Sequence, residues 1–407
     1  MKKTLLKNYA KLVVTMGLNV QKGQDVLIRA ELDQPEFVKY AVDECYKAGA
    51  RKVMVEWSYQ PLTKLHVKHQ SLKTLSEVTS WEEEKLKYQS ETLPCELYIM
   101  SEDPDGLVGV NQEKMAEARQ AKYPIIKPYK DAMENRQQWC IAAVPGAAWA
   151  KKIFPGVPKN TAIELLWKAI LFAARADEDP LAAWQEHNRD LTAKCEYLNG
   201  LKLTALEYKA GNGTDFKVGL IEDSMFLGAN EKTLGGIDFN ANIPSEEVFI
   251  SPKKGEAEGI VYASKPLSYQ GELIEDFWIR FEKGKAVEVH AERNEELLKK
   301  LISMDENAAY LGECALVPYD SPISKLGIVF YNTLFDENAA CHLALGMGFT
   351  NCIKDYDKYT LEECREKGVN DSIIHEDFMI GTEDLSVVGI TKDGKRVQIF
   401  ERGNWAF

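Results

Sequence analysis

Short apolar runs alternate with helical segments through the first half of this chain. Four of these runs have the length of a strand, at residues 25–30, 52–57, 95–100 and 139–144. Strands that are apolar along their whole length and separated by helices are typical of a parallel sheet covered on both faces. The pattern therefore predicts an α/β domain with Rossmann-like layers and a mostly parallel sheet.

The same region lacks the signature of a dinucleotide site. No G-x-G-x-x-G follows the first predicted strand, and the Gly-containing segments 106–109 and 146–148 lack the required spacing and downstream acid. A layered α/β fold does not by itself imply nucleotide binding. The sequence therefore argues against a nucleotide cofactor.

The pattern changes near residue 200. Residues 201–208 and 215–220 predict two strands, joined by the tight-turn sequence Gly211-Asn212-Gly213-Thr214. Further strands are predicted at 248–250, 259–263, 276–281 and 286–290. This second region is expected to combine helices and strands, with more antiparallel pairing than the first.

Length and this change of pattern predict two domains. A chain of 407 residues exceeds what one hydrophobic core usually organises. Two long predicted helices, at 158–176 and 179–198, lead up to the change. We predict an α/β domain over 1–199 and an α+β domain over 200–407.

Charge and hydropathy argue against two classes of partner. The net charge is −13, whereas binding of nucleic-acid phosphates needs a basic face. No apolar run reaches the roughly 20 residues that cross a bilayer. The segment Met1–Lys7 begins like a signal peptide, but polar residues interrupt the apolar stretch and no small-residue cleavage site follows. We expect a cytoplasmic protein without nucleic-acid or membrane partners.

The eight cysteines are scattered, without any C-x-x-C pair. Zinc-ribbon spacing is therefore absent, and several cysteines lie in apolar surroundings. We expect buried free thiols, as in a reducing compartment, and we assign Cys314 and Cys341 to the core although they adjoin candidate metal ligands.

Six candidate metal ligands lie in the second half of the chain. Four are carboxylates and two are imidazoles: Glu247, Glu313, Glu337, His342, His375 and Asp377. His375 and Asp377 lie on a predicted strand, where alternate side chains share a face. Glu313 has small and apolar neighbours, and a carboxylate is costly to bury there without a cation or a partner. Oxygen ligands mixed with imidazole suit two ions of zinc, cobalt, manganese or magnesium.

Glu337 and His342 are five positions apart in the sequence. On one continuous helix their side chains would lie about 140° apart. We therefore expect Glu337 to precede a helix that carries His342 near its start, with Asp336 or Asn338 as the cap.

Four segments carry a likeness to a known family: 242–249, 309–318, 332–346 and 370–381. Through them, and over nearly its whole length, the chain resembles the thermophilic aminopeptidase family of metallopeptidases, of the aminopeptidase T, aminopeptidase S and PepS type. The resemblance implies metal ligands at the six positions named above and a homodimer of two-domain chains, with the metal pair in the C-terminal domain. It also implies removal of single N-terminal residues from short peptides, with broad specificity and often good activity on leucine.

The chain departs from the family at Phe349, where the resemblance implies a tyrosine seven residues after the histidine at 342. If that hydroxyl stabilises the oxyanion, its loss costs on the order of 100-fold or more in rate. Tyr331 and Tyr356 are nearby in sequence and could supply a donor. Otherwise, activity is lower or altered.

The expected reaction is attack on the scissile carbonyl by a water that two cations ionise, with a carboxylate passing the proton to the leaving amine. Glu313 is the first candidate for a bridging or general-base role, because its surroundings are the most apolar. Glu246, next to Glu247, is the second candidate, and it could instead hold the substrate ammonium.

Two other readings remain open. The H-x-D pair at His375 and Asp377, with one more histidine, also occurs in non-haem iron oxygenases. In those proteins the second histidine normally follows the pair, whereas here no histidine follows His375 and the glutamates would have no role. The second reading is a catalytically silent peptide- or metal-binding relative, which Phe349 keeps open.

The remaining histidines lie in polar segments and are expected at the surface: His66, His69, His187 and His290. The aromatic C-terminus, Trp405 to Phe407, is expected to pack either on a partner subunit or on its own domain.

Overall fold

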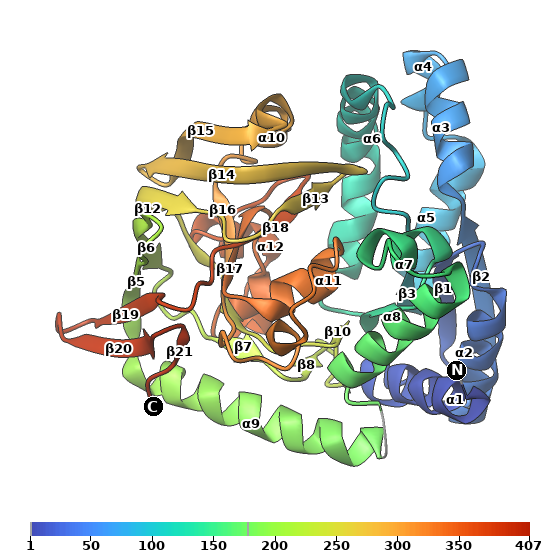
Figure 1. Cartoon of the computed structure of the whole chain (residues 1–407), viewed down its shortest axis with the longest axis horizontal. Helices are drawn as coiled ribbons and strands as arrows, with labels where there is room; N and C mark the ends of the chain where they lie inside the picture. Colours follow the sequence, from blue (N-terminus) through green and yellow to red (C-terminus); the bar gives the residue numbers. More distant parts are fainter. Residues whose placement is uncertain (1, 177–178) are drawn as a thin grey trace. The chain divides into compact units, whose positions relative to one another are not determined.

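A computed structural model of the chain describes residues 2–176 and 179–407. A five-stranded sheet with the order β10-β4-β3-β1-β2 organises the first part of the chain (Figure 1). Its strands are β1 (Asp25–Glu31), β2 (Lys52–Ser58), β3 (Cys95–Met100), β4 (Trp139–Ala143) and β10 (Asn242–Ile243). All neighbouring pairs in this sheet run parallel. The predicted parallel α/β sheet is therefore confirmed.

The helices of this part follow the predicted alternation. They are α1 (Lys3–Leu12), α2 (Pro35–Ala48), α3 (Gln60–His69), α4 (Leu72–Leu75), α5 (Ser80–Thr92), α6 (Gln112–Met133), α7 (Ala147–Ile153) and α8 (Lys159–Ala173). Buried Tyr9 of α1 donates a hydrogen bond to the Ala143 carbonyl at the end of β4, and its ring packs against Phe37 of α2 and the edge of Trp167 of α8. The core thus joins helices to the sheet.

The chain divides into two compact units at a different place from the predicted 199/200 boundary. The first unit contains Met1–His187 and Asn230–Ser245, and the second contains Asn188–Ala229 and Glu246–Phe407. The excursion 230–245 belongs to the first unit because β10 pairs in parallel with β4. It also contains the small ladder of β8 (Glu231–Lys232) and β9 (Asp238–Phe239). Strands of two residues carry no readable sequence pattern.

The second unit contains a five-stranded antiparallel sheet with the order β18-β17-β16-β11-β7. Its strands are β7 (Leu227–Gly228), β11 (Val248–Ile250), β16 (Leu311–Leu316), β17 (His342–Gly346) and β18 (His375–Met379). Nearly all of its residues are buried. Five of the six candidate ligands lie on these strands or immediately before one of them.

A nine-stranded sheet forms the rest of this unit, with the order β13-β14-β12-β6-β5-β19-β20-β21 and β15 paired with β14. Its strands are β5 (Leu203–Lys209), β6 (Asp215–Leu220), β12 (Pro252–Tyr262), β13 (Leu267–Tyr269), β14 (Glu272–Glu282), β15 (Lys285–Arg293), β19 (Ser386–Thr391), β20 (Arg396–Glu401) and β21 (Asn404–Trp405). The predicted hairpin is confirmed, because β5 and β6 pair antiparallel across residues 210–214. The α+β prediction for this half of the chain holds.

Helix α9 (Pro180–Leu201) runs from the first unit into the second, and the short helices α10 (Glu295–Leu301), α11 (Thr333–Asp336) and α12 (Leu361–Glu366) lie in the second. The C-terminal Phe407 stacks on Tyr197 of α9 at 3.9 Å between ring centroids. The aromatic end of the chain therefore packs on its own unit. Among the described residues, no helix is long and apolar enough to cross a membrane.

All eight cysteines are buried free thiols, as predicted. His66, His69 and His290 are exposed, also as predicted. His187 is not at the surface: only 8% of it is exposed, and its Nε2 lies 2.6 Å from the Ser245 carbonyl oxygen. The polar residues around it in sequence lie on other faces of α9.

Candidate metal centre

The antiparallel register of the second unit brings the candidate ligands of three strands onto one face. Glu313 of β16 and Asp377 of β18 both pair with Ala344 of the central strand β17. Directly paired residues share a face of the sheet, and so do residues two apart along a strand. His342, two residues before Ala344, therefore lies on that face. So does His375, which pairs with Gly346.

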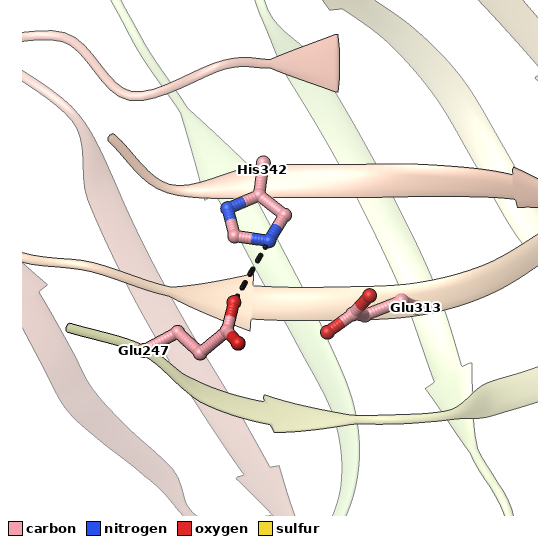
Figure 2. A group of neighbouring side chains, drawn as sticks. All are labelled: Glu247, Glu313 and His342. Carbon is pink, nitrogen blue, oxygen red and sulfur yellow. Dashed lines mark ion pairs between the residues drawn. The ribbon is translucent and has the colours of Figure 1, made fainter. Parts of the chain in front are cut away.

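Five of these side chains form two groups of three. Glu247, Glu313 and His342 offer ligand atoms within 4.8 Å of one another, and so do Glu313, His375 and Asp377. The His342 Nε2 atom lies 3.2 Å from Glu247 Oε2, and the Glu313 carboxylate points toward the same space (Figure 2). Glu313 is common to both groups. A shared carboxylate is the arrangement expected between two adjacent cations.

The second group is equally close. The His375 Nε2 atom lies 3.2 Å from Glu313 Oε2 and 3.4 Å from Asp377 Oδ1. The predicted shared orientation of His375 and Asp377 on a strand is thus present, since both belong to β18.

The other ring nitrogen of each histidine contacts a backbone carbonyl. His342 Nδ1 lies 3.1 Å from the Ala340 oxygen, and His375 Nδ1 lies 2.7 Å from the Met347 oxygen. A carbonyl oxygen can only accept a hydrogen bond, so each Nδ1 carries a proton. Each Nε2 faces the carboxylates, where a bound cation would take the place of its proton, and an Nδ1–H held by a carbonyl is typical of histidines that bind metals.

Burial and crowding shift the pKa values of the cluster. Burial, together with nearby Asp377 and Glu247, raises the pKa of Glu313 to about 7, although the hydrogen bond from His375 lowers it. Burial, followed by Asp377 and Glu247, also raises the pKa of Glu337 well above its usual value. Burial lowers the pKa of His342, but Glu247 outweighs it and brings the value to about 10. The buried carboxylates therefore repel one another, and the two histidines supply too little positive charge to neutralise them.

These residues fit the binding of divalent cations. Glu247, Glu313, Glu337 and Asp377 are each at most 8% exposed. Asp377 Oδ1 is buried without a hydrogen-bond partner, although His375 lies near it. Buried carboxylates in this number are costly unless cations neutralise them. A donor set of oxygen and imidazole is the chemistry that zinc, cobalt and manganese accept.

The prediction that His342 lies on a helix is wrong. Helix α11 ends at Asp336, a 3₁₀ turn spans Glu337–Ala339, and Ala340 is extended before β17 begins at His342. Pairing of β17 with strands on both sides overrides the helical propensity of its Ala and Leu residues. Glu337 still lies beside the cluster, because its carboxyl group affects the pKa values of the cluster: it lowers the pKa of Asp377, while Asp377 and Glu247 raise its own.

Glu246 precedes Glu247 in the chain, and Phe349 lies beside His375. Glu246 is 6% exposed, and its backbone N–H donates to Asn338 Oδ1 at 2.6 Å. The Phe349 ring packs 5.0 Å from the His375 ring and 5.3 Å from the Phe249 ring, by centroids. A hydrophobic ring thus borders the second group.

The two nearby tyrosines have different surroundings. Tyr356 packs against a separate apolar cluster of Ile221, Ile353, Cys364 and Val369. Tyr331 lies in the loop before α11 with φ of 54°, and the Asp336 carboxylate accepts hydrogen bonds from the N–H groups of the flanking residues Phe330 and Asn332. Of the two tyrosines, Tyr331 is therefore the one whose loop is fixed by Asp336, the residue next to the candidate ligand Glu337.

A model of thermophilic metalloproteases (M29) matches residues 2–405. This chain belongs to that family. Aminopeptidase AmpS of Bacillus subtilis is 41% identical over 99% of this chain and 98% of its own length. Aminopeptidase T of Thermus thermophilus is 40% identical over 98% of both chains. The resemblance to thermophilic aminopeptidases is confirmed, and so is the prediction of a metal-dependent hydrolase of this type.

Two solved structures have folds similar to that of this chain. Wild-type AmpT from Thermus thermophilus aligns over the whole of both chains with a TM-score of 0.88 and 38% identity. A 2,5-dihydroxypyridine dioxygenase from Pseudomonas putida KT2440 aligns with a TM-score of 0.55 but only 10% identity. The second likeness concerns the fold alone and gives no support to the oxygenase reading.

Proposed function

We propose that this chain is an aminopeptidase that uses two metal ions to remove the N-terminal residue from short peptides. The observation that carries the proposal is the Glu313 carboxylate, which belongs to both groups of candidate ligands. Membership of the metalloprotease family and the aminopeptidase names of its relatives support the reaction class.

In this proposal, Glu247 and His342 would hold one ion, and His375 and Asp377 would hold the other. Glu313 would serve both ions, and Glu337 would complete the set from its turn. When bound, two divalent cations make a water more acidic and polarise a peptide carbonyl. The candidate metals are zinc, cobalt, manganese and magnesium, because each accepts oxygen ligands.

If Glu313 bridges, another carboxylate must move the proton. We assign this role to Glu246, which is buried beside Glu247 and belongs to neither group of three. Its alternative role is to bind the substrate ammonium. Glu246→Gln separates the two roles, since loss of a proton carrier lowers kcat whereas loss of an ammonium partner raises KM.

Hydrolysis of leucyl-anilide by chelator-stripped protein tests the proposal directly. We expect activity to return with one of the four metals and to saturate near two ions per chain. Saturation at one ion would contradict the dinuclear assignment. Tight metal binding without any peptide turnover would identify a catalytically silent relative, with Phe349 as the first position to change.

We further propose broad specificity with good activity on leucine, a homodimeric assembly and a cytoplasmic location. The resemblance to the aminopeptidase family supports the specificity and the assembly, and the buried free thiols support the location. A panel of aminoacyl-anilides tests the specificity, and light scattering of the purified protein tests the assembly.

A further inference from the structure

Asn338 connects two segments that carry candidate ligands, although they are far apart in sequence. Its Oδ1 accepts a hydrogen bond from the Glu246 backbone N–H at 2.6 Å. Its Nδ2 donates to the Leu334 carbonyl at 2.8 Å and to Glu337 Oε1 at 3.2 Å. The side chain is completely buried. One amide thus contacts the carboxylate of Glu337 and the backbone just before Glu247.

The partners fix the orientation of this amide. A backbone N–H can only donate and a backbone carbonyl can only accept, so oxygen must face Glu246 and nitrogen must face Leu334. The second N–H of the same nitrogen is therefore directed at Glu337 Oε1. That hydrogen bond restricts the rotation of the Glu337 carboxylate.

The Asn338 backbone is anchored as well. Its carbonyl accepts a hydrogen bond from Ser321 Oγ at 3.2 Å. The residue also lies within the 3₁₀ turn Glu337–Ala339, which leads into β17 and His342. A displacement of Asn338 would therefore move Glu337 and the approach to Glu247 together.

We propose that Asn338 is a positioning residue for the metal pair, which sets the orientation of the Glu337 carboxylate and couples it to the segment that carries Glu247. This inference rests on the proposed two-metal function. Partners that orient ligands in this way typically contribute about 10- to 100-fold to metal affinity or activity. Asn338 itself touches neither substrate nor ion.

The test uses Asn338→Asp in the full-length protein. Aspartate keeps an acceptor for Glu246 N–H, but it removes the N–H groups donated to Glu337 and to the Leu334 carbonyl and places a negative oxygen there. Asn199→Asp is the matched control, because the Asn199 amide also bonds to the backbone of another segment. Its Oδ1 accepts from Phe226 N–H at 2.7 Å, and its Nδ2 donates to the Phe226 carbonyl at 3.0 Å. Zn²⁺ and Co²⁺ affinities are measured by competition with a chromogenic chelator. The visible spectrum of the Co²⁺ form reports ligand geometry.

We expect Asn338→Asp to weaken binding of at least one ion by about 10- to 100-fold and to alter the Co²⁺ spectrum. Asn199→Asp should leave both unchanged. Equal affinities of Asn338→Asp and wild type would overturn the inference while the proposed function stands. No metal binding by the wild type would overturn both.

A double-mutant cycle distinguishes positioning from general destabilisation. If Asn338 acts through Glu337, Asn338→Asp should add little further loss of metal affinity in a Glu337→Gln background. Additive losses would refute the positioning role. Should the aspartate variant not fold, Asn338→Ser takes its place in the same cycle, since serine cannot reach Glu337 with an equivalent donor.

Discussion

Glu313 is the side chain that belongs to both groups of candidate ligands. It lies on the buried strand β16 at 4% exposure, and it faces His375 at 3.2 Å while sharing a group with Glu247 and His342. Each of the other four grouped ligands belongs to only one set. A bridging position should therefore respond to mutation differently from a terminal one.

We predict that Glu313→Gln reduces bound metal at both sites, whereas Glu247→Ala mainly affects one. The loss of kcat in Glu313→Gln should exceed the ~100-fold expected for removing an outer partner of a ligand. Metal analysis after gel filtration, together with peptide turnover, measures both effects. Exposed Glu383→Gln is the control. Full activity of Glu313→Gln would exclude its bridging and base roles alike.

Phe349 supports a second prediction at this scale, because its ring lies 5.0 Å from the ring of His375. A phenol at this position would bring a donor to the edge of the site, and an oxyanion donor is worth about 100-fold or more in rate. We predict that Phe349→Tyr raises kcat at least several-fold, with unchanged metal content. If kcat stays constant and Tyr331→Phe lowers it, Tyr331 is the donor instead.

At the scale of elements, β17 is the strand between β16 and β18, which carry the other candidate ligands of this face. Its residues facing the ligands, Ala344 and Gly346, are small, and Ala344 separates Glu313 from Asp377 in the register. A larger side chain at 344 would occupy the space between these carboxylates. The small residues are therefore part of the site even though they offer no ligand.

We predict that Ala344→Val weakens metal binding with little effect on the stability of the metal-free sheet, since valine suits a strand. Overpacking typically costs about 1–3 kcal/mol. If this cost falls on the metal-bound state, the affinity for metal drops about 5- to 150-fold. Leu343→Ile, on the opposite face of β17, is the control. Chelator competition gives the affinities, and unchanged binding by Ala344→Val would show that the carboxylates do not close over this position.

These elements also show which parts of the fold and of the site the sequence alone predicts. Whole strands were predictable where apolar runs or alternation marked them, as in β1–β4 and β11. The local sequence of β17 predicts a helix, because Ala and Leu favour helices, and only pairing with β16 and β18 makes it a strand. The sequence predicts for Asn338 no role beyond a helix cap, since its amide joins residues that the local sequence does not bring together.

Glu102, just after the end of β3, leads to a prediction of how the stability of the protein depends on pH. Burial raises the pKa of Glu102 to about 7. The folded state then keeps a proton that the unfolded chain releases above about pH 4.5, so stability falls as pH rises toward 7 and stays reduced above it. Glu102→Gln should stabilise the protein on the order of 2 kcal/mol at pH 8 and hardly at pH 5. Urea unfolding at both pH values, with exposed Glu91→Gln as control, measures this. An equal gain at both pH values would contradict it.

At the scale of the whole molecule, the candidate ligands lie in one of the two compact units. Glu247 and all the later ligands belong to the second unit, which contains Glu246–Phe407. The boundary itself was predicted differently, because the chain returns to the first unit to add β10 beside β4. Removal of metal should therefore act on one unit more than on the other.

We predict that chelation speeds amide hydrogen exchange in β16, β17 and β18 but leaves β1 and β3 of the first unit nearly unchanged. Metal bound at 100 times its Kd stabilises the native state by about 2.7 kcal/mol, and its removal also leaves the buried carboxylates uncompensated. Exchange measured by mass spectrometry with and without chelator reports each strand separately. The chelator-treated Glu313→Gln protein is the control, since it has little metal to lose. Equal acceleration in both units would show that the metal pair stabilises the chain as a single cooperative body.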